Sequence, residues 1–569
     1  MFGTGDSRRW MESSKITAFS TLLLCTTSLL LSLDGTSAIP RHFMGKWYGR
    51  QLRRDWIADQ ILGTEPEDPL ADQSPICDDK TKITLGYFNQ TLDHFGDGTN
   101  SKVAKNGYWQ QYYQINDRFF NKRKNGDTPV IFLMIGGEGP ILTKWVCNPN
   151  YTYMTAAAKY NAKVIQLEHR FFGRNKDLKD MSVDSLQYLT TEQALADINK
   201  FIQDYNAQNK WTAPKWVAFG GSYPGTIAAR LRQVYPNITQ GNVASSAPMF
   251  ATVDFWQYAY VMENTIKSTS QACYDSVKAA FKYMVNATLT EAGRDELNKE
   301  FSLIPPLETK TVLKEDLDTV TSTIFSAFQG IIQYTYDGAN DMVKNKTGDN
   351  QQTISRACQI MTDPKTKGKH LQRLYNVFLL ESGADANFSS SYADSNVDFI
   401  NTDLNGPGAD MRGRPAITRC LETLYPSVYI SNNALTCSSG KLNATQIYNR
   451  VTNTLQQIGR PEDFNATNVF LPNGAFDPWS SLGVPDEPDN KNRADHLVTR
   501  LTPESAHCSD MYPYYKGEPA GLKATRDMFF KEVDYYVNLD SVFGSNNGAA
   551  SIGFSLVLFV VSAYFGFFN

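Results

Sequence analysis

Residues 216–229 read WVAFGGSYPGTIAA, an apolar run that passes through two glycines into a serine and then into small residues. Such a run predicts a buried strand, an abrupt turn and the start of a helix. A turn of this kind exposes the Ser222 hydroxyl at the carboxyl end of a sheet, where crowding demands small neighbours. Pro224 stands where the usual G-x-S-x-G pattern has its second glycine, which arrives one residue later as Gly225. Taken alone, the segment leaves open a glycine-rich turn with an ordinary serine.

Two segments of similar form follow later in the chain. Asp477 lies in NGAFDPWS at 473–480 and His507 in SAHCSD at 505–510, each after an apolar run that reads as a strand. Ser, then Asp, then His, each at a strand end, is the chain order of α/β-hydrolase catalytic triads. In this interpretation Ser222 is the nucleophile, His507 takes its proton as the base, and Asp477 orients the histidine.

The sequence has six histidines, so the candidates for the base can be compared. Four are disfavoured as the base. His42 lies near the leader, and His94 and His370 follow no expected strand. His496 stands at the start of an expected strand, where a structural role is favoured. His169 does follow a strand, but it precedes Ser222 in the chain. We therefore expect His169 to be a structural partner of Glu168 or Arg170.

The loop at 136–140, GGEGP, follows the first strong apolar run. In α/β-hydrolases this loop supplies one backbone N–H of the oxyanion hole, and the residue after the nucleophile supplies the other. We assign these two donors to Gly137 and Tyr223. A phosphate-cradling turn is the alternative, but the loop lacks the Lys-Ser/Thr pair of a P-loop.

The pattern of apolar runs predicts an α/β fold. Short apolar runs at 130–135, 163–167 and 216–219 alternate with a helical period at 190–205, which is typical of a parallel sheet with crossover helices. The strand pattern returns at 468–471 and 496–499, and a closing helix is expected at 528–537. We therefore expect an α/β-hydrolase core at 76–250 and 458–540, interrupted by a mostly helical cap at 251–457.

The amino-terminal end resembles a secretory signal peptide. Basic residues precede an apolar run at 16–33, and a small-residue exit, Thr36-Ser37-Ala38, follows it. We expect cleavage after Ala38, which makes 1–38 the signal peptide; a membrane anchor is the rival interpretation. The polar stretch 39–75 is a leader, a propeptide or a solvated linker.

Glycosylation signals and cysteines support the secretory route. Eight Asn-x-Ser/Thr sequons are present, at Asn89, Asn150, Asn237, Asn286, Asn345, Asn387, Asn443 and Asn465. Beyond the signal peptide the chain keeps seven cysteines, and a secreted context favours disulfides with at least one thiol left over. Their spacing fits no zinc site, so we expect no metal and no cofactor. A net charge of −4 gives no reason to expect a nucleic-acid partner.

The carboxyl-terminal segment 541–569 combines small residues with an apolar tail that ends at Phe568. This composition resembles a GPI-attachment signal. The rival interpretation is a terminal membrane-spanning helix, although the basic cytoplasmic flank usual for such a helix is missing. Both place the protein on the outer surface of a membrane, and both are favoured over a buried helix.

These motifs together resemble one family closely, that of lysosomal prolyl carboxypeptidase, dipeptidyl peptidase II and thymus-specific serine protease. The matching segments span about residues 80 to 535: 88–95, 136–140, 168–173, 189–197, 220–225, 473–480 and 507–508. The resemblance implies an α/β-hydrolase core with a helical cap, and a serine exopeptidase that commonly cleaves after proline. It implies the triad Ser222, Asp477 and His507, with Trp479 helping to wall the S1 pocket; simple core packing is the alternative for Trp479.

The family also bears on the cysteines and on location. Cys273 with Cys358 resembles a cap disulfide of the family, and Cys420 with Cys437 would close a local loop. Cys77, Cys147 and Cys508 stay unassigned. The apolar tail differs from the soluble lysosomal members, so an extracellular or outer-membrane location is expected, with a lysosome-like compartment as the alternative.

Three classes of function remain open. The first is a serine exopeptidase, either a carboxypeptidase or a dipeptidyl peptidase, which acts on peptides. The second is an esterase or lipase on the same fold, which would need a wider apolar cleft. The third is an inactive surface protein of the family, against which the intact set of catalytic residue types argues.

Overall fold

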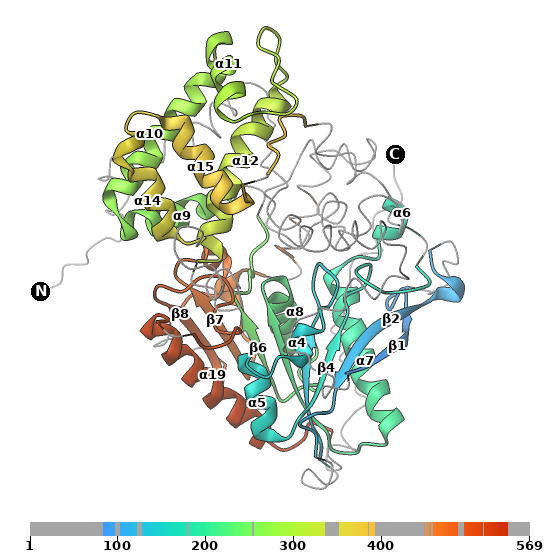
Figure 1. The fold of residues 1–569 in the computed structure, drawn as a ribbon. Coiled ribbons are helices and arrows are strands. Elements are labelled where there is room, and N and C mark those ends of the chain that lie inside the picture. Colours follow the sequence, from blue (N-terminus) through green and yellow to red (C-terminus); the bar gives the residue numbers. More distant parts are fainter. Residues whose placement is uncertain are drawn as a thin grey trace, which may run out of the picture.

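In the part of the chain that the structure describes, eight strands form one sheet at the base of the molecule (Figure 1). The computed structural model describes residues 83–96, 103–121, 128–178, 182–252, 255–335, 352–384, 386–392, 459–487, 494–515 and 517–543, with a few single residues besides. The strands are β1 (Ile83–Thr91), β2 (Tyr108–Asn116), β3 (Val130–Ile135), β4 (Lys163–Leu167), β5 (Lys215–Gly221), β6 (Gly241–Ser245), β7 (Val469–Gly474) and β8 (Leu497–Thr502).

The order across the sheet is β1-β2-β4-β3-β5-β6-β7-β8. Strand β2 runs antiparallel to both β1 and β4, and every pair from β4 to β8 is parallel. This is the α/β-hydrolase arrangement that the sequence predicts. Because the carboxyl ends of parallel strands lie at one edge, the segments after β3, β5, β6, β7 and β8 all reach the same side of the sheet.

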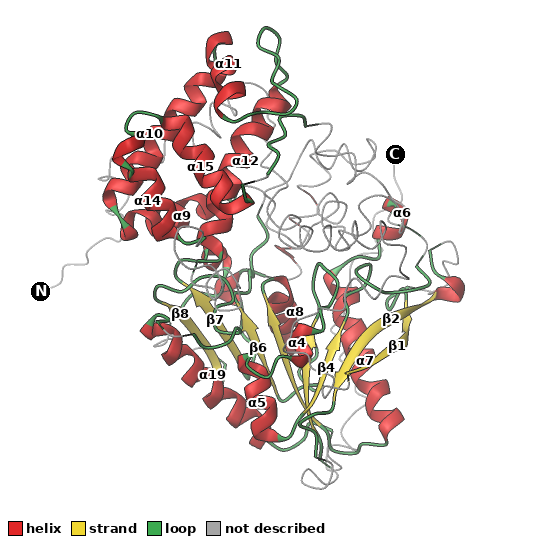
Figure 2. Cartoon of the chain, viewed as in Figure 1, coloured by secondary structure: helices red, strands yellow, loops and turns green. Residues whose placement is uncertain are grey.

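The central strands β3, β4 and β5 are buried on both faces, which explains their apolar runs. Along β3, Ile131, Leu133 and Ile135 join one hydrophobic cluster, while alternate residues join a second one. The first cluster includes residues of α7 (Thr191–Asn209) and α8 (Tyr223–Val234), and the second includes residues of α5 (Thr152–Tyr160) and α19 (Ala520–Asn538). Helices therefore cover the sheet from two sides, as Figure 2 shows.

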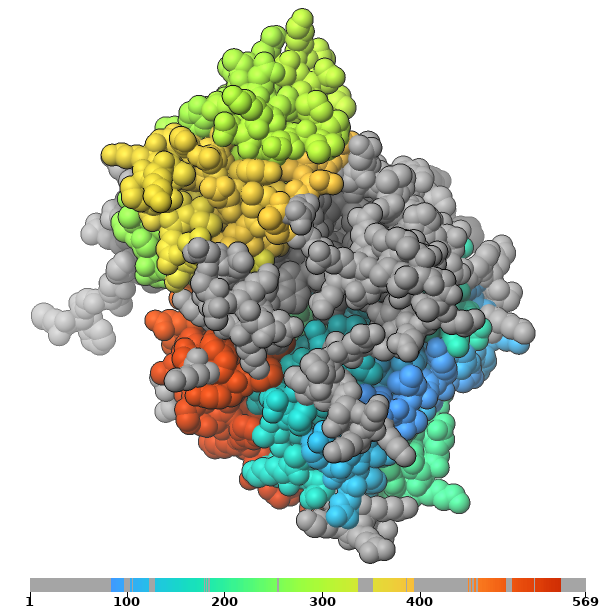
Figure 3. All heavy atoms as spheres, in the orientation of Figure 1, coloured from blue at the N-terminus to red at the C-terminus, as the bar shows by residue number. Residues whose placement is uncertain are grey.

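The chain between β6 and β7 carries a group of helices above the sheet, which we call the cap (Figures 1 and 2). Among the described residues, the cap includes the helices α9 (Trp256–Thr269), α10 (Gln271–Thr288), α11 (Glu291–Glu300), α12 (Lys314–Gln333), α14 (Ile354–Thr362) and α15 (His370–Ser382). Figure 3 shows the cap as a lobe above the carboxyl-terminal part of the core. Cap and core share a hydrophobic cluster that includes Met262 of α9 and Leu482 of the core.

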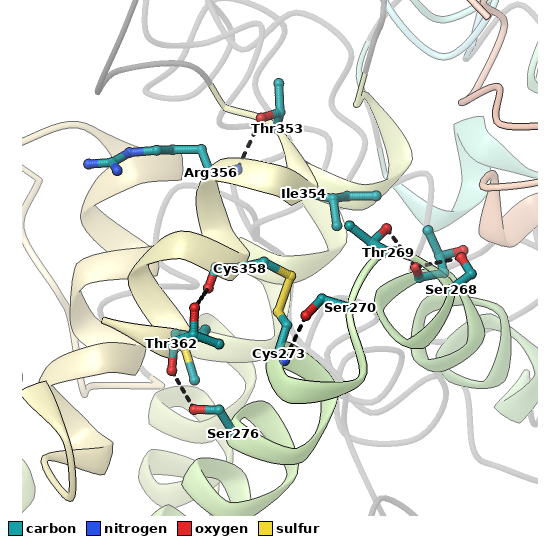
Figure 4. The surroundings of a disulfide bond; sticks show 12 residues. Ser268, Thr269, Ser270, Cys273, Ser276, Thr353, Ile354, Arg356, Cys358 and Thr362 are labelled. Atoms are coloured by element: carbon teal, nitrogen blue, oxygen red, sulfur yellow. Dashed lines mark hydrogen bonds between the residues drawn. A yellow bond between two sulfur atoms is a disulfide. The ribbon is translucent and has the colours of Figure 1, made fainter. Parts of the chain in front are cut away.

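A disulfide joins Cys273 of α10 to Cys358 of α14, the pair that the family resemblance implies (Figure 4). Both helix starts are capped nearby, because Ser270 accepts from the Cys273 N–H and Thr353 accepts from the Arg356 N–H. Cys147 is also disulfide-bonded. Cys508 is a buried free thiol.

Several predicted features lie outside the described residues: the signal peptide 1–38, the leader 39–75, the apolar tail beyond 543, Cys77, Cys420, Cys437, Asn345 and Asn443. Within the described ranges, no helix combines the length and the apolar character needed to cross a membrane. The other six sequon asparagines are all exposed: Asn89, Asn150, Asn237, Asn286, Asn387 and Asn465.

Candidate active site

Ser222 lies at a sharp turn between β5 and α8. Its backbone is in a rare conformation for a residue with a side chain, with φ 64° and ψ −132°. The turn is held by the Ser222 N–H, which donates to the Ser245 carbonyl of β6 at 2.9 Å. Gly220 must be glycine here, because a Cβ would lie 2.1 Å from the Pro224 carbonyl oxygen. This strained strand-to-helix turn has the shape expected of a nucleophile elbow.

Pro224 fits the elbow for two reasons. It occupies the second position of α8, where the missing N–H has no intrahelical acceptor and costs nothing. The close approach of α8 to β6 is made instead at Gly225, where a Cβ would lie 2.7 Å from the Ser245 carbonyl oxygen. Gly225, one residue later than the second glycine of the G-x-S-x-G pattern, thus provides the close contact between helix and sheet at this point.

Asp477 and His507 are paired at the carboxyl ends of β7 and β8. The Asp477 carboxylate lies 2.7 Å from Nδ1 of His507, through Oδ2. Its other oxygen, Oδ1, accepts from the Trp479 N–H at 3.0 Å. Both side chains are buried, and Asp477 is 0% exposed. Because a carboxylate only accepts, Nδ1 carries a proton, which leaves Nε2 as the reactive nitrogen.

The surroundings of His507 favour its charged form. Burial acts to lower the pKa, but the charge and hydrogen bond of Asp477, together with Cys508, outweigh it and hold the pKa well above its ordinary value. Burial raises the pKa of the Cys508 thiol, so the thiol is neutral near pH 7 and the lasting contribution is that of Asp477. His507 is therefore a strong proton acceptor once it is neutral.

The loops that carry Ser222 and His507 contact each other through their neighbours. A Cβ at Gly221 would lie 3.0 Å from Sγ of Cys508, and the Cys508 N–H donates to Oγ of Ser246 at 2.9 Å. Nε2 of His507 is buried without a hydrogen-bond partner among the described residues. The serine and the histidine loops are thus adjacent, while the serine–histidine hydrogen bond itself is not formed, as is common in apo enzymes.

A buried carboxyl lies behind these two loops. Asp510 accepts from Oγ of Ser245 at 2.5 Å, and burial raises its pKa to about 6. Ser245 is the residue whose carbonyl receives the Ser222 N–H. Asp510 therefore connects the histidine loop to the elbow through one serine.

The glycine loop after β3 leans against the start of α8. A Cβ at Gly137 would lie 2.5 Å from Cγ of Pro224, so the loop backbone and the helix terminus are in direct contact. Glu168 fixes the far end of this loop, since its Oε1 accepts from the Ile141 N–H at 3.1 Å. Gly137 and Tyr223 are thus brought to the same corner of the sheet.

The segment Glu168-His169-Arg170 contains the structural contact expected between His169 and Arg170, and it also holds neighbouring parts of the site. Nδ1 of His169 lies 3.0 Å from the Arg170 carbonyl, and Nε2 lies 3.0 Å from the Tyr223 hydroxyl. Arg170 makes a two-fold contact with Asp197 of α7, at 2.7 Å from Nε and from Nη2. Three consecutive side chains therefore hold the glycine loop, the residue after Ser222 and the neighbouring helix. In the sequence, the signal for this role was that the three residues come directly after the apolar run that forms β4.

One prediction about the histidines is wrong and another is confirmed. No strand was expected before His94, but β1 ends three residues earlier, at Thr91. His94 still does not serve as a base, because its Nε2 lies 2.8 Å from Asp197, within the structural ion-pair network. His496 is structural, since it pairs with Glu532 at 2.9 Å and stacks on Tyr535.

Trp479 lies at the boundary between core and cap. Its ring packs against Phe255 and Tyr258, at centroid distances of 5.3 and 5.6 Å. Its indole N–H donates to Oε1 of Gln333, the last residue of α12. The side chain is 7% exposed, so the aromatic cluster is mostly covered. Trp479 therefore joins the segment that begins at Asp477 to the cap.

The sheet order and the strained serine elbow define an α/β-hydrolase. The family model described as Serine carboxypeptidase S28 matches residues 90–415 and 419–529. The chain belongs to this family and is a serine peptidase.

Relatives from animals match most of the chain. The Caenorhabditis elegans protein named "Putative serine protease F56F10.1" is 35% identical over 94% of this chain and 98% of its own length. Mouse lysosomal Pro-X carboxypeptidase is 24% identical, covering 80% of this chain and 91% of its own. Mouse thymus-specific serine protease is 25% identical, covering 79% of this chain and 86% of its own.

Proposed function

We propose that this serine peptidase is an exopeptidase that cleaves peptide bonds near chain ends, with proline preferred at P1, through an acyl-enzyme on Ser222. The observation that carries the proposal is the buried Asp477–His507 pair at 2.7 Å, whose free Nε2 lies in the loop adjacent to the serine elbow. A nucleophile, a base and an orienting carboxylate at three strand ends are the parts that acyl transfer requires.

The reaction follows from these positions. Nε2 of His507 accepts the Ser222 proton while Oγ attacks the scissile carbonyl, and the imidazolium then gives that proton to the leaving amine. Water repeats the sequence in the second half: it loses a proton to Nε2, attacks the acyl carbonyl and releases Ser222 as its hydroxyl. Asp477 keeps the proton on Nδ1 and stabilises the imidazolium, because its second oxygen is fixed by the Trp479 N–H.

The oxyanion formed in each half is assigned to the backbone N–H groups of Gly137 and Tyr223. Tyr223 begins α8, so the positive end of the helix dipole favours the developing charge. Gly137 is held against Pro224, and its loop is fixed by Glu168. Donors placed in advance in this way stabilise the transition state without reorganisation.

Proline specificity is supported by two observations. Trp479 lies two residues after Asp477 in an aromatic cluster with Phe255 and Tyr258, and the small exposed part of its flat ring is the face that we assign to a pyrrolidine ring. A relative that matches most of the chain is named Pro-X carboxypeptidase.

We place the protein in the secretory pathway, on the outer surface of a membrane through its tail at 541–569, with a lysosome-like compartment as the alternative. The amino-terminal apolar run and the exposed sequon asparagines support the route. The small-residue, apolar composition of the tail supports the attachment.

The test is labelling with a fluorophosphonate probe, followed by peptide assays. We expect the wild-type ectodomain to be labelled and Ser222→Ala to take no label. Release of coumarin from X-Pro-aminomethylcoumarin identifies a dipeptidyl peptidase, and loss of one residue from peptides ending in Pro-X identifies a carboxypeptidase. Turnover of esters without peptides would overturn the proposal in favour of an esterase, and absence of Ser222-dependent labelling would indicate an inactive protein.

A further inference from the structure

Gln333 lies where the cap meets the catalytic histidine. It is the last residue of α12 and is 0% exposed. The last carbonyls of a helix have no partner within the helix, so each must find one elsewhere. The Gln333 carbonyl finds its partner in the backbone N–H of His507, at 2.8 Å.

The Gln333 side chain joins three further groups. Its Oε1 accepts from the Tyr258 hydroxyl at 2.7 Å and from the Trp479 indole N–H at 3.1 Å. Its Nε2 donates to the Tyr334 hydroxyl at 3.0 Å. One buried amide thus connects α9, α12 and the segment that begins at Asp477. Losing such an amide leaves buried donors unpaired, which the fold tolerates poorly.

The next residue extends the contact to the imidazole itself. The Tyr334 ring lies edge-on to the His507 ring, with centroids 6.0 Å apart and planes at 83°. The carboxyl end of α12 also carries the negative end of the helix dipole, which favours the imidazolium that forms when His507 takes a proton.

We propose that Gln333 is a positioning residue for His507, and that it makes the alignment of the Asp477–His507 pair depend on a correctly seated cap. The inference rests on the proposed function, in which His507 is the base. Gln333 acts through the histidine and the Trp479 segment, not by contact with the reacting atoms. A misplacement of about 1 Å of a catalytic group costs up to about 10²-fold in rate.

The test replaces Gln333 by methionine, which keeps the side-chain length and removes the three side-chain hydrogen bonds, while the main-chain carbonyl can still accept from the His507 N–H. We expect Gln333→Met to lower the fluorophosphonate labelling rate and the peptide kcat together, by up to about 10²-fold, with KM within about twofold of wild type. Gln329→Met is the matched control. Gln329 is buried one turn earlier on α12, and its Oε1 has no hydrogen-bond partner among the described residues. This control should match wild type in both measurements.

Tyr258→Phe removes the hydroxyl that donates to Gln333 and leaves the amide itself in place, which keeps the test valid if Gln333→Met does not fold. It should lower both rates in the same direction and by less. The inference is overturned if labelling stays at the wild-type rate while KM rises, since Gln333 would then serve only substrate binding in the cap. It is also overturned if Gln333→Met behaves as Gln329→Met does. A wild-type protein that takes no label at Ser222 would instead overturn the proposed function.

Discussion

Substitution of Gly137 by alanine tests the oxyanion hole most directly. Gly137 is absent from the residues of positive φ, so alanine can adopt its backbone conformation and the effect is steric alone. The new Cβ would lie 2.5 Å from Cγ and 2.7 Å from Cδ of Pro224. Carbon atoms pack at about 3.5 to 4.0 Å, so roughly 1 Å of movement is required.

The movement should be made by the loop and not by the helix. Pro224 cannot retreat readily, because its carbonyl group already lies against Gly220 and the next residue, Gly225, lies against β6. Displacement of the loop takes the Gly137 N–H away from the oxyanion position. Loss of one such donor costs about 10²–10³ in kcat, or about 2.7–4 kcal/mol of transition-state stabilisation.

The assay compares kcat and KM on the preferred peptide with the fluorophosphonate labelling rate. Gly139→Ala is the matched control in the same loop, because a Cβ there would meet nothing within 4 Å. We expect Gly137→Ala to lose about 10²–10³ in kcat with little change in KM, and Gly139→Ala to stay near wild type. The double variant Gly137→Ala/Pro224→Gly removes the clash and should recover part of the loss. A Gly137→Ala enzyme with kcat close to that of Gly139→Ala would refute the assignment of this donor.

Three further predictions concern charge, stability and attachment. Asp477→Asn should lower kcat by about 10⁴-fold and move the acid limb of the kcat/KM profile to lower pH. The reason is that the carboxylate that raises the pKa of His507 is lost, while burial still lowers that pKa. An unchanged pH profile would contradict the pairing, and the buried control Asp318→Asn on α12 should stay near wild type. Burial lowers the pKa of His169 from 6.5 to about 4, so between these pH values the unfolded chain binds a proton that the folded chain does not. About 3 kcal/mol of stability should therefore be lost as the pH falls from 6.5 to 4. His169→Phe should show a shallower fall of Tm between pH 7 and 4.5 than wild type, and parallel Tm curves for the two proteins would count against this. Phosphatidylinositol-specific phospholipase C should release the protein from intact cells, and a protein that stays bound excludes the GPI interpretation.

The sequence predicted the parts of the fold whose burial is uniform. Strands β3 and β4 have the expected bounds, because both faces are covered and every position must be apolar or hydrogen-bonded. Strand β2, YWQQYYQIN, was not predicted, since its polar residues suggest exposure. Gln111 is buried all the same, because it donates to the Glu168 carbonyl and accepts from Gln90. Tertiary hydrogen bonds of this kind leave no trace in hydrophobic periodicity.

The candidate site was predictable to the level of residue types at strand ends. Chain order placed Asp477 and His507 at neighbouring strand ends, and the structure brings them to 2.7 Å. The supports of the site could not be found in the same way. Gln333 ends an ordinary amphipathic helix, and nothing in that pattern distinguishes it from Gln329 one turn earlier. Its role follows only from the place at which the cap returns to the sheet.

Pro224 shows how one departure from a motif is compensated elsewhere. In the usual elbow, a glycine two residues after the nucleophile allows the helix to approach the sheet. Here Gly225 provides that approach, which frees the earlier position to contact the glycine loop. The proline ring then fills the space beside Gly137, so that this residue must lack a side chain. Gly137, Pro224 and Gly225 therefore form one steric unit, and a change at any of them should be judged by its effect on the other two.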